Sequence, residues 1–113
     1  MANKTFYDLS VSESLCQSLE KMGIKEPTPV QAEAIHALRN GKDTIVQAQT
    51  GTGKTLAFLL PIYDRIKVQA DNIQTLILTP TRELTLQIAK VAAQLGKANG
   101  VRSLAIYGGQ DIE

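Results

Sequence analysis

The chain has little of several features that mark whole classes of protein. It holds one cysteine, Cys16, so no internal disulfide can form, and this usage fits a reducing, cytosolic compartment. No apolar run reaches the length of about 20 residues that crosses a bilayer, and the first residues lack the apolar core of a signal peptide, so we expect no membrane partner. The formal net charge is only +1, so any contact with nucleic acid must come from a few placed groups rather than from a broad basic field.

What is present fits one small globular domain. The chain has 113 residues, of which 43% are hydrophobic and 20% are charged, a balance typical of soluble proteins. Cys16 itself fits either a small apolar filler in a helix or a reactive thiol.

The central stretch, residues 43–55, passes from a β-branched run through a glycine-rich turn into a helical pattern. This order is the one that a phosphate-binding loop between a strand and a helix needs. Gly51 and Gly53 lack a Cβ, so the backbone can approach a ligand closely. Lys54 is placed to reach the outer phosphates of a nucleotide, and Thr55 offers a hydroxyl to Mg²⁺. The alternative is an ordinary glycine-rich turn.

Periodicity and turn signals predict four helices and three strands. The helices are expected over residues 11–22, 29–39, 54–68 and 82–97, and the strands over residues 44–48, 73–78 and 101–107. Ser10 and Glu13 match a capping box before the first helix, and Pro61 should kink the third. Because strands alternate with helices, we expect parallel strands joined by right-handed crossovers. The predicted fold class is therefore α/β of the P-loop NTPase kind.

Gln31 supports two interpretations. Thr28 and Gln31 match a capping box at the start of the second helix, in which the glutamine bonds back to the threonine amide. The functional alternative uses the same side chain to donate to N7 and accept from N6 of adenine. The residues around Gln31 help to decide between these two interpretations.

The chain resembles the DEAD-box RNA helicases in four ordered motifs. Residues 23–31 are similar to the Q motif of that family, and Phe6 stands seventeen positions earlier, where the family carries an isolated aromatic. Residues 48–55 resemble motif I, which itself begins with alanine, so Ala48 departs from the general P-loop pattern but agrees with this family. Residues 80–84 resemble motif Ia, although Thr85 replaces the alanine that usually follows. Residues 108–109 match the paired glycines of the family.

This resemblance implies an ATP site, an Mg²⁺ site and an RNA site. The residues implied in binding ATP are Phe6, Gln31, Ala48, Gln49, Thr50, Gly51, Thr52, Gly53, Lys54 and Thr55. Lys54 and Thr55 are the implied catalytic residues, and Thr55 is the implied Mg²⁺ ligand. The residues implied in binding RNA are Pro80, Thr81, Arg82, Gly108 and Gly109. Contacts to the RNA backbone do not distinguish one base from another, so RNA binding should be independent of sequence. The alternative for Arg82 is an exposed residue in the first turn of a helix. The alternative for Gly108 and Gly109 is a simple turn after a strand.

The resemblance also implies a domain organisation. Residues 1–113 correspond to the N-terminal portion of the first RecA-like helicase domain, with residues 1–41 as the Q-motif region and residues 42–113 carrying the P-loop, motif Ia and the glycine pair. About three strands of a parallel sheet flanked by helices would be present, so the fold is expected to be incomplete.

The sequence contains neither an Asp-Glu-Ala-Asp nor a Ser-Ala-Thr motif. The family's second domain, which supplies an arginine finger, is also absent, and loss of such a finger lowers the rate by on the order of 10³ to 10⁵. The leading prediction is the ATP- and RNA-binding front part of an ATP-dependent RNA helicase that does not hydrolyse ATP by itself. The alternative is a non-catalytic fragment that binds ATP or ADP or self-associates, for example as a homodimer through an exposed sheet edge or swapped elements.

Overall fold

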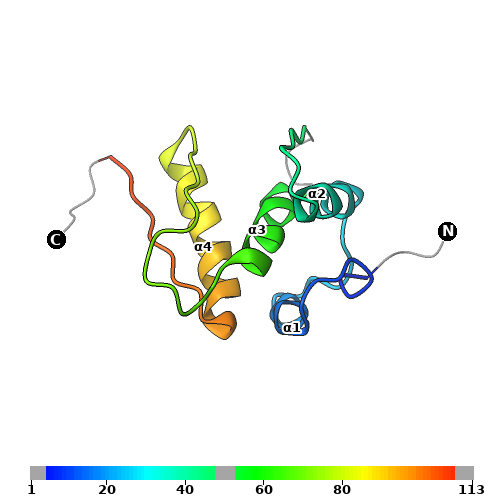
Figure 1. Ribbon diagram of the computed structural model, residues 1–113. Helices are drawn as coiled ribbons and strands as arrows, with labels where there is room; N and C mark the ends of the chain where they lie inside the picture. Colours follow the sequence, from blue (N-terminus) through cyan, green and yellow to red (C-terminus); the bar gives the residue numbers. More distant parts are fainter. Residues whose placement is uncertain (1–4, 48–52, 109–113) are drawn as a thin grey trace.

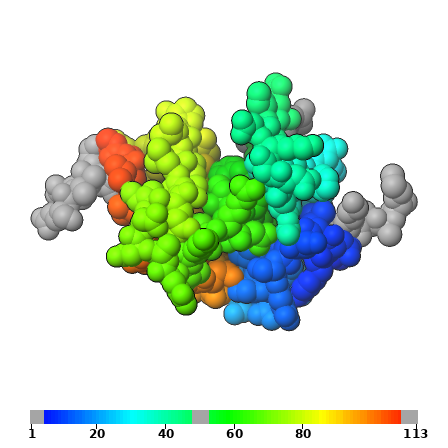
Figure 2. Space-filling view, viewed as in Figure 1, coloured from blue at the N-terminus to red at the C-terminus, as the bar shows by residue number. Residues whose placement is uncertain are grey.

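The structure is a computed structural model that describes residues 5–47 and 53–108. These ranges contain four helices, α1 (Glu13–Lys21), α2 (Pro29–Arg39), α3 (Lys54–Arg65) and α4 (Arg82–Asn99) (Figure 1). Helix α3 contacts both α2 and α4, while α1 packs against α4. In the space-filling view, residues 42–47 and the start of α4 form two raised columns with α3 between them (Figure 2). None of the described helices is long and apolar enough to cross a bilayer.

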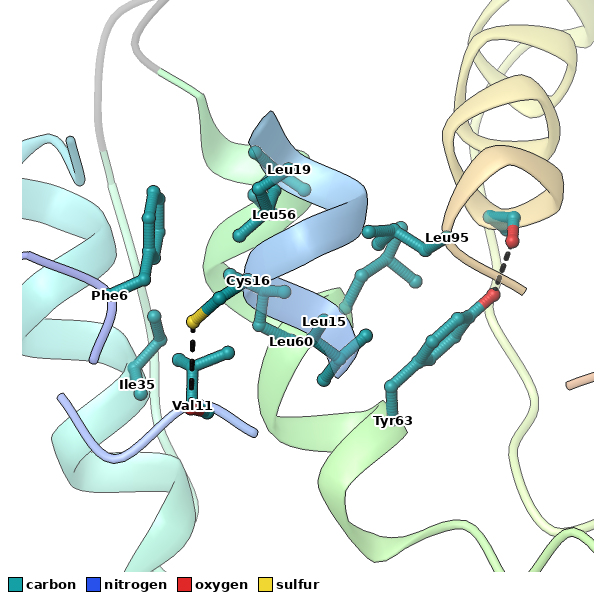
Figure 3. Packing of buried hydrophobic residues seen from close by; sticks show 12 residues of the cluster. Phe6, Val11, Leu15, Cys16, Leu19, Ile35, Leu56, Leu60, Tyr63 and Leu95 are labelled. Carbon is teal, nitrogen blue, oxygen red and sulfur yellow. Dashed lines mark hydrogen bonds between the residues drawn. The ribbon is translucent and has the colours of Figure 1, made fainter. Parts of the chain in front are cut away.

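Helix α1 begins later than predicted. Its N-cap is Ser12, whose hydroxyl accepts a hydrogen bond from the Leu15 amide at 3.4 Å. Ser10, the predicted cap, lies in the preceding turn with a φ of 62°, so the capping-box prediction was wrong. Val11 precedes the cap and lies beside Cys16, whose thiol is 3.6 Å from the Val11 carbonyl (Figure 3). This pairing is a hydrophobic staple, which fixes the angle at which the chain enters α1.

Helices α2 and α4 lie close to their predicted bounds because their end signals are strong. Thr28 caps α2 with Pro29 in the first position. Gly100 closes α4 in the left-handed conformation, with a φ of 71°. Pro61 lies inside α3 and is buried, and this helix ends at Arg65, earlier than predicted.

The core lies where α1, α3 and α4 meet, with α2 closing one side (Figure 3). Its largest fully buried side chains are Leu19, Ile35, Leu59, Leu60 and Leu95. The Tyr63 hydroxyl lies in this core, and it donates to the Ala92 carbonyl at 2.6 Å. Burial raises the pKa of Tyr63, because the charged form would lose its hydration.

The three predicted strands are not formed in the part of the chain that the structure describes. Residues 44–47, 73–78 and 101–107 carry no strand, and no backbone hydrogen bond joins any of these segments to another within residues 5–47 and 53–108. Ala48, the last residue of the first predicted strand, lies outside the described residues. Most of their apolar side chains face solvent, as Ile45 (99% exposed), Ile73 (89%) and Leu78 (85%) illustrate, although Val101 packs against the core. The predicted parallel α/β sheet is therefore contradicted. An apolar pattern favours a strand only where neighbouring strands supply hydrogen bonds and cover.

Arg39 holds the N-terminal turn, residues 6–10, against α2 and α3. Its Nη1 donates to the Leu9 carbonyl at 3.2 Å and also to the Ser10 carbonyl, and it pairs with Asp64 of α3 at 3.4 Å. Burial raises the pKa of the Asp64 carboxyl, and the nearby arginine opposes that shift. This one side chain joins the turn, α2 and α3.

A second polar cluster joins α1 to the end of α4. Asn99, the last residue of α4, accepts a hydrogen bond from the Ser14 hydroxyl and donates to the Ser18 hydroxyl at 3.3 Å. It also donates to the Leu95 carbonyl of its own helix. The polar edge of α1 is thereby held against the C-terminal turn of α4.

Candidate functional site

The side chain of Gln31 joins the start of α2 to the start of α3. It is only 3% exposed. Its Oε1 accepts from the Thr28 amide at 2.9 Å, and the Thr28 hydroxyl accepts from the Gln31 amide at 3.3 Å, so the predicted capping box is confirmed. Its Nε2 donates to the Gly53 carbonyl at 3.0 Å. Both halves of one amide are therefore used, one within α2 and one across 22 residues of chain.

Glycine is needed at position 53 for two independent reasons. Gly53 is the N-cap of α3 and has a φ of 80°, a left-handed conformation that side chains rarely adopt. A Cβ added there would also lie 2.3 Å from Nε2 of Gln31. The contact between Gln31 and Gly53 therefore exists only because this position has no side chain.

The first turn of α3 has the groups that an anion needs. Its N-cap, Gly53, makes no side-chain cap hydrogen bond, so among the described residues no side chain caps the first amides at the positive end of the helix dipole. Lys54 is the first residue and is exposed, while Thr55 is the second and is half-buried. An ammonium group and a hydroxyl oxygen suit a phosphate and a hard cation such as Mg²⁺. Five further predicted residues lie outside the described residues, namely Ala48, Gln49, Thr50, Gly51 and Thr52.

Phe6, the aromatic residue implied in binding ATP, lies in the hydrophobic core. It is 3% exposed and belongs to the cluster that contains Ile35, beside which it lies in Figure 3. Its carbonyl accepts hydrogen bonds from the Leu9 and Val11 amides, which close the N-terminal turn. Protein atoms thus cover the ring, and stacking on a base requires one of its faces to open.

A second group of predicted residues gathers at the start of α4. The Thr81 hydroxyl caps the helix by accepting from the Leu84 amide at 3.1 Å. Arg82 is the first helical residue, and its Nη2 donates to the Gly108 carbonyl at 2.6 Å. Pro80 precedes this cap and is exposed, and Gly109 lies outside the described residues. The structure therefore brings the proline-threonine-arginine stretch together with the first of the two glycines.

Thr85, the departure from the family pattern, takes part in the same cap. Its hydroxyl donates to the Thr81 carbonyl at 3.0 Å and also pairs with the Thr79 hydroxyl. The extra hydroxyl therefore finds local partners where the family usually has alanine.

Sequence reasoning gave no role to Tyr107. The guanidinium carbon of Arg82 lies 5.6 Å from the centre of the Tyr107 ring, within cation–π range. An aromatic residue directly before the two glycines was the available signal, but the pattern alone placed it only at the end of an expected strand.

Two groups of residues thus emerge, and no described hydrogen bond or ion pair joins them. One contains Gln31, Gly53, Lys54 and Thr55 at the start of α3, and the other contains Arg82 and Gly108 at the start of α4. A family profile described as DEAD/DEAH box helicase matches residues 28–113, which include both groups.

The chain belongs to the DEAD/DEAH box helicase family. The DEAD-box ATP-dependent RNA helicase CshA of Bacillus cereus is 53% identical over 109 residues, which cover 96% of this chain and 21% of that protein. The RNA helicase CrhR of Synechocystis is 50% identical over 109 residues, covering 96% of this chain and 22% of that protein. The chain thus spans about a fifth of the length of these relatives.

Solved structures of DEAD-box proteins follow the same path. The RNA helicase Prp28 of Chaetomium thermophilum, bound to ADP, superposes with a TM-score of 0.84 at 35% identity, covering 98% of this chain and 28% of that one. A DEAD box protein of Methanococcus jannaschii superposes with a TM-score of 0.80 at 32% identity, covering 97% and 31%. The helices of this DEAD-box chain therefore take the family's arrangement, although the three expected strands are not paired in the described residues.

Proposed function

We propose that this chain is the ATP- and RNA-binding front part of an ATP-dependent RNA helicase, which couples ATP hydrolysis to local unwinding of RNA. The observation that carries the proposal is the hydrogen bond from Gln31 to the Gly53 carbonyl. It joins a side chain suited to reading adenine to the helix start that is suited to holding phosphates. A nucleotide whose base contacts Gln31 and whose phosphates contact the start of α3 would join the same two places.

The nucleotide site uses groups at both ends of the ligand. Lys54 and the free amides of the first turn of α3 hold the outer phosphates, and the Thr55 hydroxyl is a ligand for Mg²⁺, which neutralises phosphate charge when bound. Gln31 contacts the adenine edge once its side chain, which is 3% exposed here, is uncovered, and Phe6 stacks on the ring once the N-terminal turn opens. ADP bound to the related Prp28 helicase supports an adenine nucleotide as the ligand.

The RNA site lies at the start of α4. Arg82 contacts a backbone phosphate, helped by Pro80, Thr81 and the main chain of the two glycines, Gly108 and Gly109. None of these groups reads a base edge, so binding is independent of RNA sequence. The names of the relatives, which are RNA helicases, support RNA as the nucleic acid.

The division of labour follows the order of the chain. Residues 1–41 form the adenine-recognition region, and residues 42–113 carry the phosphate loop, motif Ia and the glycine pair of the first helicase domain. Lys54 and Thr55 are the catalytic residues of the proposal, and they act in ATP hydrolysis together with groups of the second helicase domain. A reducing, cytoplasmic location fits the single cysteine.

Calorimetric titration tests this function. The chain is titrated with ATP, ADP and GTP, with and without Mg²⁺, beside a Gln31→Ala variant. We expect both adenine nucleotides to bind, GTP to bind more weakly, and the variant to lose that preference. If the folded chain binds no nucleotide, or binds GTP as well as ATP, the proposed function is wrong.

A second candidate is a self-associating fragment. It is favoured by the exposed apolar side chains of residues 42–47, 73–79 and 101–107, among them Ile45, Ile73 and Leu78. A second copy could cover these side chains without any sheet being formed. Sedimentation equilibrium decides the matter: a concentration-dependent dimer supports this candidate, and a monomer at all concentrations excludes it.

A further inference from the structure

The Arg82 guanidinium is held by two groups of the segment that follows α4. Nη2 donates to the Gly108 carbonyl at 2.6 Å, and the guanidinium carbon lies 5.6 Å from the centre of the Tyr107 ring. Both contacts come from adjacent residues, which lie 25 and 26 positions after the arginine. Tyr107 is half-buried, while Arg82 and Gly108 are exposed.

These contacts matter because a free surface arginine is conformationally disordered. Arginine has one of the largest rotamer entropies of any side chain, and a ligand must overcome it to bind a fixed guanidinium. A ring against the guanidinium removes much of that freedom beforehand. A guanidinium also has five N–H donors, of which the Gly108 carbonyl takes one, so donors remain for a phosphate.

The surroundings of the guanidinium suit a phosphate. Arg82 is the first residue of an 18-residue helix, whose positive dipole end adds to its charge. Among the described residues, a Cβ added to Gly108 would have no atom within 4 Å, which leaves space for a ligand at this point. The Arg82 guanidinium is therefore a cation of fixed orientation beside an open part of the described surface.

We propose that Tyr107 is a positioning residue of the RNA site. Its ring, together with the Gly108 carbonyl, holds the Arg82 guanidinium in the orientation that receives a phosphate of single-stranded RNA. The ring acts through the arginine and makes no base contact of its own. This inference rests on the proposed RNA-binding function.

The test measures binding of a fluorescein-labelled oligouridine to the full chain by fluorescence anisotropy at fixed salt concentration. The variants are Tyr107→Leu, which removes the ring, and Tyr107→Phe, which keeps it. An exposed cation–π contact corresponds to about a two- to fivefold change in an equilibrium constant, so Tyr107→Leu should weaken RNA binding by about that factor. Tyr107→Phe should bind like the parent chain. Tyr7→Leu is the matched control, because Tyr7 is 57% exposed and lies in the N-terminal turn.

A double-mutant comparison separates positioning from direct contact. Arg82→Ala should lower RNA affinity and reduce the salt dependence of binding by about one phosphate contact. In that background Tyr107→Leu should have no further effect. If it weakens RNA binding as much as it does with the arginine present, the ring contacts RNA itself and the inference is overturned. An equal loss in Tyr107→Phe also overturns it, because the hydroxyl would then be responsible.

A readout that needs no RNA keeps the inference separable from the proposed function. In the ¹⁵N–¹H spectrum, the Nε–Hε signal of Arg82 should carry a ring-current shift that Tyr107→Leu abolishes and Tyr107→Phe retains. If the parent chain binds no RNA, the RNA-binding proposal fails, and the role of Tyr107 in RNA binding fails with it even when the shift is seen. If the chain binds RNA but Tyr107→Leu changes neither the affinity nor the shift, only the inference fails. Circular dichroism confirms that each variant is folded.

Discussion

Replacing Gln31 with glutamate separates its two hydrogen bonds. In Gln31→Glu one carboxylate oxygen still accepts from the Thr28 amide, so the capping box is kept, and glutamate is itself a favoured residue at that helix position. The donor to the Gly53 carbonyl is lost, and an oxygen replaces it. The variant therefore removes the link to α3 while it leaves the start of α2 intact.

The expected cost follows from burial. The lost hydrogen bond is worth about 0.5–1.5 kcal/mol, and a charge at a site that is 3% exposed adds a desolvation cost. The positive dipole end of α2 stabilises the introduced carboxylate by about 0.3–1 kcal/mol, which offsets part of this cost. A net loss of about 1–3 kcal/mol corresponds to about a 5- to 150-fold change in an equilibrium constant. We expect the free energy of unfolding to fall by that amount, and ATP binding to weaken because the start of α3 is no longer held to α2.

Calorimetric titration with ATP and thermal unfolding, each followed as a function of pH, measure this loss. Burial should raise the pKa of the introduced carboxyl, and its protonated form can donate to the Gly53 carbonyl as the amide does. The ATP-binding deficit of Gln31→Glu should therefore shrink as the pH falls. Gln31→Ala, which has no titratable group, should show the same deficit at every pH.

Equal ATP affinity in Gln31→Glu and in the parent chain would refute this reasoning. The amide would then serve only as a helix cap, and its contact with Gly53 would have no part in nucleotide binding. A deficit in Gln31→Glu that does not change with pH would refute the donor argument alone.

Three further predictions concern stability. Tyr63→Phe should lower the free energy of unfolding by about 1 kcal/mol, because it removes the bond to the Ala92 carbonyl, and equilibrium urea unfolding measures this loss. Burial raises the folded-state pKa of Tyr63, so the parent chain should lose stability as the pH rises past the unfolded value of 10.0, and the phenylalanine variant should lose less. Gly96→Ala should destabilise the chain by about 1–3 kcal/mol in urea unfolding, although alanine normally favours helices, because its Cβ would lie 2.3 Å from the Val101 carbonyl oxygen. Burial raises the pKa of the Asp64 carboxyl above the unfolded value of 3.8, so the protonated carboxyl stabilises the folded chain at acid pH. This stabilisation is lost as the pH rises from 3.8 through the raised value. Asp64→Asn should remove that part of the pH dependence of the melting temperature.

The sequence predicted best what short-range chemistry controls. The start of α2 follows from Thr28 and Pro29, and the end of α4 follows from Gly100, because caps involve residues within one turn of each other. Ser10 shows the limit of that rule, since its turn conformation outweighed a matching capping pattern.

The errors concern elements that depend on distant partners. A strand needs a neighbouring strand, and the pattern of residues 73–78 cannot say whether one is present. The site shows the same division: the bond from Gln31 to Thr28 was readable from spacing, whereas its bond to Gly53 depends on packing of α2 against α3. The ring of Tyr107 was missed for the same reason, because its contact with Arg82 joins segments 25 residues apart.

The packing of α1 against α4 has a consequence for the newly made chain. The apolar side of α1 is covered by the last helix, which ends at Asn99, 78 residues after α1 ends at Lys21. At translation rates of about 5–20 residues per second, α1 must wait about 4–16 seconds for its partner to be synthesised. During that interval the leucines of α1 that pack against α4 stay exposed, and only α3, which is made earlier, can cover part of them.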